Sequence, residues 1–173
     1  MSGRRRTILA VLGLAVLGPV VPALAAPQPG SPDATFVQTI HQGNLTEIAA
    51  GQDAEKNGQD SCVKEVAAII VRDHTKLDEQ LSDLAKKGNV VLADAPSATQ
   101  QAGLDKVKVL AGTAGYDKAW LGTQEQSHEG ALALIDKQIK EGKDADTVQA
   151  ALKARPVVAM HLDMVRGGSC HVM

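Results

Sequence analysis

Four polar side chains interrupt apolar helical stripes in this sequence, and their chemical types suit metal ligation. The clearest case is His74. Apolar residues recur before and after it at steps of three and four, as one face of a helix requires, and this rhythm predicts an apolar residue at 74. Glu47, His128 and His161 stand in similar surroundings in three other helical stretches. A buried polar group must find a partner, so one such residue on each of four helices predicts a shared polar cluster.

The sequence leaves two arrangements of this cluster open. In one, Glu47 accepts hydrogen bonds from imidazole N–H groups, and the cluster only satisfies its own members. In the other, three imidazoles and one carboxylate bind a transition-metal ion, for which Zn, Fe, Mn or Cu are the candidates. Glu125 is a further candidate ligand, because Glu125 and His128 have the Glu-x-x-His spacing of carboxylate-metal bundles. The partner motif is missing, since Val71 stands three residues before His74.

Two other polar residues near the stripes are expected to face away from the cluster. Neighbouring helix residues point about 100° apart, so His41, next to the core-facing Ile40, is expected to point outward. The same offset from His74 predicts a solvated Asp73, with a carboxylate that supports the metal site from outside as the alternative. His161 is expected nearer one end of the helices than the other three candidates. The sequence has no nucleophilic-serine elbow, phosphate loop or paired Cys-x-x-Cys.

Five helices must position these residues, and together they predict an all-α fold. Strand-like alternation is almost absent after residue 32, and Gly or Asn recur where helices would stop. Helices are expected at residues 33–57, 60–87, 98–112, 116–141 and 144–167. Short turns join the first two and the last two into antiparallel hairpins. The long connection, 88–115, can return the chain along the bundle, which predicts a ferritin-like four-helix bundle with one long crossover that carries a short extra helix.

The two cysteines provide a check on this topology. Cys62 lies at the start of the second helix, and Cys170 lies just past the end of the last one. A bundle without the crossover puts them at opposite ends, too far apart for a disulfide, whereas the crossover puts them at the same end. The sequence alone leaves open whether they form a disulfide or remain two separate thiols.

The first residues predict an exported protein. Three arginines, a short apolar run and Ala23-Leu24-Ala25 are the parts of a secretory signal peptide at 1–25. General secretion is expected ahead of the twin-arginine route, and an uncleaved membrane anchor is the alternative. A linker at 26–32 would then precede the bundle domain at 33–167 and a tail at 168–173. The mature protein is expected to be periplasmic, extracellular or associated with the cell envelope.

The composition speaks against nucleic acid as a partner. Cleavage after residue 25 removes three of the 18 basic residues and none of the 20 acidic ones, so the mature chain has 15 basic and 20 acidic residues. Its aromatic residues are Phe36, Tyr116 and Trp120. A negatively charged chain with so few aromatic side chains suits neither phosphate neutralisation nor base stacking. We expect no transmembrane segment after signal cleavage, and a partner in the cell envelope is a further expectation.

The chain resembles the domain-of-unknown-function 4142 family of exported bacterial proteins, often labelled predicted outer-membrane proteins. The resemblance covers about 33–167 and rests on four segments: "NLTEI" at 44–48, "DH" at 73–74, "YD" at 116–117 followed by His128, and "PVVAMHL" at 156–162. It implies a ferritin-like bundle, an extracytoplasmic location and characteristic polar positions at Glu47, His74, His128 and His161. It supplies no established activity. Because the second Glu-x-x-His of ferritins is missing, a mononuclear site is favoured over a di-iron site.

The sequence therefore supports one leading hypothesis about function. The chain is an exported ferritin-like bundle protein of unassigned activity, and its inward Glu/His cluster is a candidate transition-metal site. A metal-dependent oxidoreductase is one alternative. A cell-envelope or stress interaction module with a purely structural polar core is the other.

Overall fold

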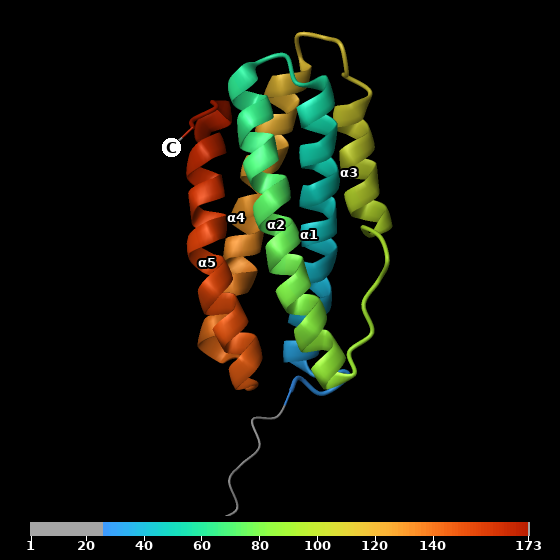
Figure 1. Cartoon of the computed structure of the whole chain (residues 1–173), viewed down its shortest axis with the longest axis vertical. Coiled ribbons are helices and arrows are strands. Elements are labelled where there is room, and N and C mark those ends of the chain that lie inside the picture. The colour runs from blue at the N-terminus through green and yellow to red at the C-terminus, as the bar shows by residue number, and fades with distance from the viewer. Residues whose placement is uncertain (1–25, 173) are drawn as a thin grey trace, which may run out of the picture.

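A computed structural model describes residues 26–172, which form five α-helices (Figure 1). The helices are α1 (Pro32–Asn57), α2 (Ser61–Gly88), α3 (Ala98–Lys108), α4 (Tyr116–Glu141) and α5 (Ala145–Val165), and a 3-10 turn (Arg166–Gly168) follows α5. Their ends agree with the sequence prediction to about one turn. The signal peptide expected at 1–25 lies outside the described residues. None of the described helices has the length and apolar character needed to cross a membrane.

Side-chain caps explain where most of these helices begin. Four of the five start after a residue whose side chain accepts a backbone N–H of the first turn. These caps are Ser31, Asp60, Ser97 and Asp144. Such a bond satisfies a donor that has no partner within the helix, and it stabilises the helix by roughly 1 kcal/mol. The helix α2 ends at Asn89, whose φ of 51° is left-handed, a conformation that Asn visits more readily than most residues.

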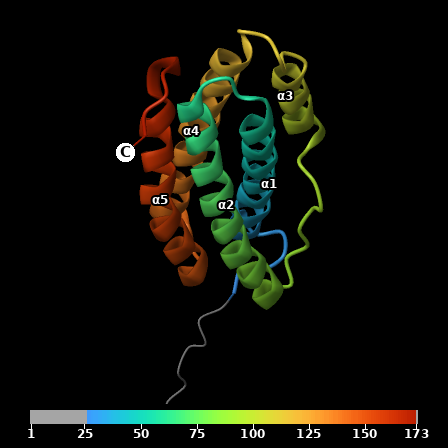
Figure 2. The same ribbon diagram turned by 45° about the horizontal axis from the view of Figure 1, so that its top comes forward.

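The helices form a ferritin-like bundle with one long crossover, as the sequence predicts. In Figure 1, α1 rises and α2 descends beside it, and the chain then returns upward through residues 89–97 and α3. The helix α4 descends again and α5 rises. The helix α1 packs beside α4 and α2 packs beside α5, while α3 lies outside the bundle against α1 and α4 (Figure 2).

A disulfide closes one end of the bundle. Cys62, at the start of α2, is bonded to Cys170, beyond the 3-10 turn, with Cα atoms 6.0 Å apart. The two residues meet because the crossover places the start of α2 and the end of α5 at the same end. Of the two states that the sequence left open, the structure therefore has the disulfide.

The first hairpin is closely packed at Gly51 in α1. A Cβ atom on this residue would lie 2.5 Å from Cγ2 of Val71 and 3.0 Å from the carbonyl oxygen of Ala67. Contacts this short leave no room for a side chain, so glycine permits the close approach of α1 and α2. The approach lies about one helical turn from His74 on α2.

The core has two apolar clusters, and polar side chains lie where the clusters meet. On α2, His74 stands between Ile70 of one cluster and Leu81 of the other. On α5, His161 stands between Val158 and Met164 in the same way. The expectation that His161 lies nearer one end is wrong. The helix α5 has only 21 residues, so a position close to its C-terminal end reaches the middle of the bundle.

Candidate metal centre

Three imidazoles from three helices converge in the centre of the bundle. His74 belongs to α2, His128 to α4 and His161 to α5, and they are 4%, 1% and 0% exposed. Their ring centroids are 5.2 to 5.5 Å apart. One ring nitrogen from each lies within 4.8 Å of the other two. The structure thus brings together three of the four residues that the interrupted stripes singled out.

Asn44 on α1 fixes the tautomer of His74. The Nδ1 atom of His74 is 2.9 Å from Oδ1 of Asn44. The amide nitrogen of Asn44 faces the carboxylate of Asp78 at 3.4 Å, and a carboxylate only accepts, so the amide oxygen must be the atom turned toward His74. The N–H of His74 is therefore at Nδ1, and Nε2 keeps its lone pair.

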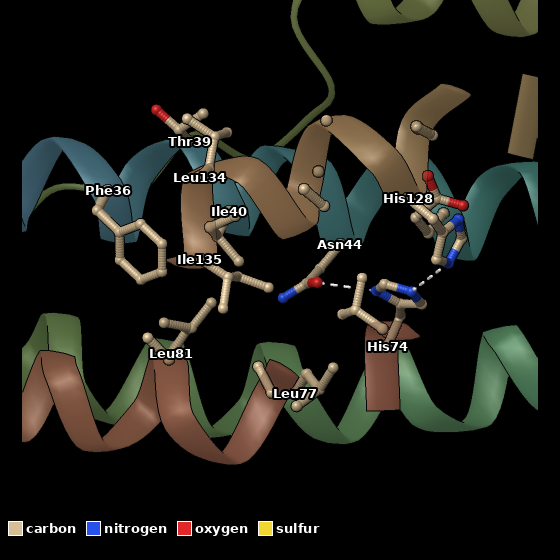
Figure 3. Close-up of a pocket in the computed structure, with 18 of the residues that line it drawn as sticks. Phe36, Thr39, Ile40, Asn44, His74, Leu77, Leu81, His128, Leu134 and Ile135 are labelled. Carbon is tan, nitrogen blue, oxygen red and sulfur yellow. Dashed lines mark hydrogen bonds between the residues drawn. The ribbon is translucent and has the colours of Figure 1, made fainter. Parts of the chain in front are cut away.

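The backbone of α4 fixes the tautomer of His128. Its Nδ1–H donates to the carbonyl oxygen of Gln124, one turn earlier in the helix, at 2.8 Å. The Nε2 atom of His128 therefore also carries a lone pair. It lies 3.4 Å from Nε2 of His74 (Figure 3), and two lone pairs cannot form a hydrogen bond with each other. A shared cation would turn this unfavourable contact into a favourable one.

Asp73 on α2 fixes the tautomer of His161 on the adjacent helix α5. Its Oδ2 atom accepts from Nε2–H of His161 at 3.1 Å, and Arg72 holds the same carboxylate at 2.8 and 3.0 Å. The Nδ1 atom of His161 is buried and has no hydrogen-bond partner. The expectation of a solvated Asp73 is wrong, since its side chain is only 17% exposed. A direction about 100° from His74 on α2 meets the neighbouring α5 rather than solvent.

The surroundings keep His74 and His161 uncharged at neutral pH. Burial, together with the neighbouring His128 and His161 rings, holds the pKa of His74 well below its usual value of 6.5. Burial also lowers the pKa of His161 to about 4, although Asp73 acts in the opposite direction. A neutral imidazole is the form that binds metal ions. Metal-binding histidines typically donate their other ring N–H to a carboxylate, carbonyl or similar acceptor, which is the arrangement that all three have here.

The two carboxylates considered from the sequence lie apart from this three-histidine set. Glu47 is buried and its Oε2 atom has no hydrogen-bond partner, but it is not one of the groups whose ligand atoms lie within 4.8 Å of one another. Glu125 accepts the backbone N–H of Gly167 at 2.9 Å and so holds the 3-10 turn after α5. Glu125 lies nearly one helical turn before His128 on α4, on the side of the bundle end where this 3-10 turn lies. Ligation by either carboxylate stays a prediction.

His41 corrects another expectation. It was expected to point outward, but it is only 6% exposed. Its Nδ1 atom lies 2.7 Å from Asp78, and its Nε2 atom lies 2.7 Å from the carbonyl oxygen of Ala93. The segment between α2 and α3 covers this part of α1, which a helical wheel of α1 alone cannot reveal. Together with Asn44, these contacts form a hydrogen-bonded chain that leads inward from the crossover to His74.

Sequence reasoning did not identify Asn44 and Asp78 as parts of the site. A signal for Asn44 was present, because it lies three residues before Glu47 and therefore on the same inward side of α1. No comparable signal marks Asp78, which matters only because α1 packs against α2. The outer hydrogen bonds of the cluster thus depend on how the helices are paired.

Comparisons with known proteins agree with the fold. A family model described as "Domain of unknown function (DUF4142)" matches residues 19–167. No curated protein matches the chain. Among solved structures, the chain is similar to a DUF305 fragment from Deinococcus radiodurans, with a TM-score of 0.70 and 14% sequence identity over 80% of this chain and 96% of the fragment. At this identity the likeness concerns the fold alone.

Proposed function

We propose that this chain, which belongs to the family of the domain of unknown function DUF4142, binds one transition-metal ion through His74, His128 and His161. The supporting observation is the direction of the ring nitrogens. Each imidazole donates one N–H to the surrounding protein and keeps its other nitrogen unshared within the cluster. A purely structural cluster would instead use these inner nitrogens in hydrogen bonds with one another.

The donor set favours zinc, copper or iron over manganese. Imidazole nitrogens suit zinc, copper and iron, whereas manganese prefers oxygen ligands. Zinc binds imidazole at about 2.0–2.1 Å, so nitrogens around a tetrahedral ion lie roughly 3.3 Å apart. The Nε2 atoms of His74 and His128 are 3.4 Å apart. This distance supports an ion bound with little change in the two rings.

The proposed setting of this site is outside the cytoplasm. The support is the signal peptide expected at 1–25, and the described residues contain no helix suited to crossing a membrane. The exported chain would then hold its ion in the periplasm, outside the cell or at the cell envelope. Fractionation of the producing bacterium with an antibody against the chain tests this location.

A metal-dependent oxidoreductase is a second candidate, and one observation favours it. Three protein ligands leave a coordination position open, as in catalytic rather than structural zinc sites. His74 and His128 also line a cavity that reaches the surface of the bundle. Consumption of oxygen or peroxide by the copper-loaded or iron-loaded protein tests this function.

Calorimetric titration of the metal-free protein with Zn²⁺ tests the proposed binding. We expect one ion per chain, and we expect His128→Gln to abolish saturable binding, because His128 supplies one of the three nitrogens. His171→Gln is the matched control, since His171 is exposed in the tail. Circular dichroism of each variant shows whether it folds. Equal binding by the folded His128→Gln variant, or no saturable binding by the unaltered protein, would refute the proposal.

Replacement of Asp73 by asparagine is expected to weaken Zn²⁺ binding by about 10- to 100-fold without changing its stoichiometry. The carboxylate holds the outer N–H of His161 and raises the basicity of the ring, and the neutral amide does this less well. Asp83→Asn is the control on the same helix, because Asp83 is exposed and pairs only with Lys86. Competition against a chromophoric chelator measures both affinities. An unchanged affinity in Asp73→Asn would assign Asp73 a merely structural role.

A further inference from the structure

A cavity of about 200 Å³ extends from the histidine cluster toward the surface. Its walls come mainly from α1, α2, α4 and α5 and are mostly apolar; they include Phe36, Ile40, Leu77, Leu81 and Ile135 (Figure 3). At its outer side lie the exposed residues Thr39 and Leu134. The cavity therefore connects the centre of the bundle to solvent between α1 and α4.

The inner end of the cavity is polar. His74, His128, Asn44 and Glu47 all contribute to its lining. The Nδ1–H groups of both imidazoles and the amide of Asn44 already have hydrogen-bond partners. The buried Oε2 atom of Glu47 has none, and no cation pairs with Glu47 within residues 26–172. A buried acceptor without a protein donor costs free energy, so a donor on a molecule bound in the cavity would stabilise this atom.

We propose that the cavity binds a small primary amine, with its apolar body against the aliphatic walls and its amino group donating to Glu47. The size follows from the volume, because an apolar cavity of about 150 Å³ accommodates benzene, and about 200 Å³ accommodates roughly eight non-hydrogen atoms. The amine follows from charge, since Glu47 is the one carboxylate in the lining and lacks a cationic partner. This binding does not depend on the proposed metal site.

Benzylamine is a suitable probe, and benzyl alcohol, which also has eight non-hydrogen atoms but carries no charge, is the matched comparison. Calorimetric titrations use the full-length protein with a chelator present, so that the probes cannot coordinate a metal ion. We expect saturable binding of benzylamine and at least tenfold weaker binding of benzyl alcohol. The substitution Glu47→Gln should weaken the binding of benzylamine at least tenfold and leave that of benzyl alcohol unchanged.

Gly43 offers a variant that fills the cavity without disturbing the fold. It lines the cavity, and a Cβ atom placed on it meets nothing within 4 Å. Leucine is also a better helix former than glycine. We therefore expect Gly43→Leu to fold and to abolish the binding of benzylamine and benzyl alcohol. Gly122→Leu on α4 is the control, because Gly122 is exposed, has equally open surroundings and does not line the cavity.

Three results would overturn the proposal. The first is the absence of saturable benzylamine binding to the metal-free protein. The second is an equal affinity for benzylamine in Glu47→Gln and the unaltered protein. The third is undiminished binding by the folded Gly43→Leu variant. None of these results bears on Zn²⁺ binding, which is measured separately and without the amine, so the two proposals can fail independently.

Discussion

Replacing both Cys62 and Cys170 by serine is expected to lower the free energy of unfolding by about 3 to 5 kcal/mol. The disulfide joins residues 108 positions apart, so it closes a loop that contains most of the bundle. Loss of this constraint gives the unfolded chain more conformational freedom, and the expected effect grows with loop length. Guanidinium denaturation of the oxidised protein and of the double variant, followed by circular dichroism, measures the difference.

A reducing agent provides the control for this prediction. It should destabilise the unaltered protein to about the level of the double variant, and it should leave the double variant unchanged. A loss below about 1 kcal/mol would show that the unfolded chain is hardly constrained by the bond. A reductant effect that persists in the double variant would show that the agent acts elsewhere.

Most of the fold was predictable because its determinants are local in the sequence. Capping residues such as Ser97 and Asp144 mark helix starts, and long amphipathic stretches mark the helices themselves. The crossover followed from the length of the segment 88–115. The two cysteines provided a long-range check, because only one of the two topologies considered brings Cys62 and Cys170 together.

The histidine cluster was predictable for a similar reason. A polar residue in an apolar stripe must face the interior, and His74, His128 and His161 do so on three helices. A helical wheel shows which residues of a helix face the bundle axis. It does not show which other helix or loop covers the residues beside them. Asp73 was therefore expected in solvent although α5 covers it, and His41 was expected outside although the crossover covers it.

The contacts of Glu47 and Glu125 could not be predicted from the helical face of each residue alone. Glu47 was correctly expected to be buried, but the angle around α1 does not tell whether its side chain reaches the imidazoles or the neighbouring cavity. Glu125 has the spacing of a ligand motif, and its carboxylate accepts the backbone N–H of Gly167. A spacing motif specifies a helical face, whereas the contacts of long flexible side chains depend on what the other helices present there.

Acidification of the metal-free protein from about pH 7 to about pH 4 is expected to lower its free energy of unfolding by more than about 3 kcal/mol. Burial lowers the pKa of His161 from 6.5 to about 4, which alone corresponds to about 3 kcal/mol. His74, whose pKa is also held well below 6.5, adds to this loss. The unfolded chain takes up protons below about pH 6.5 while the folded rings remain neutral, so stability falls as the pH falls. Urea denaturation at several pH values measures the slope.

Replacement of His161 by leucine should flatten this pH dependence, because one of the two buried rings that resist protonation is gone. His171→Leu should leave the slope unchanged, since His171 is exposed. Arg72 is the main cause of the lowered pKa of Asp73. The stability that this carboxylate contributes is therefore lost only below its ordinary pKa of 3.8, outside the pH range in which the histidines are tested. A stability independent of pH between about 6.5 and 4 would contradict the neutral, buried cluster. Because the folded rings of His74 and His161 stay neutral in this window, protons do not yet compete with Zn²⁺ for their nitrogens, and stabilisation by added Zn²⁺ should persist down to about pH 4. His161→Leu should remove this stabilisation, since His161 supplies one of the three nitrogens.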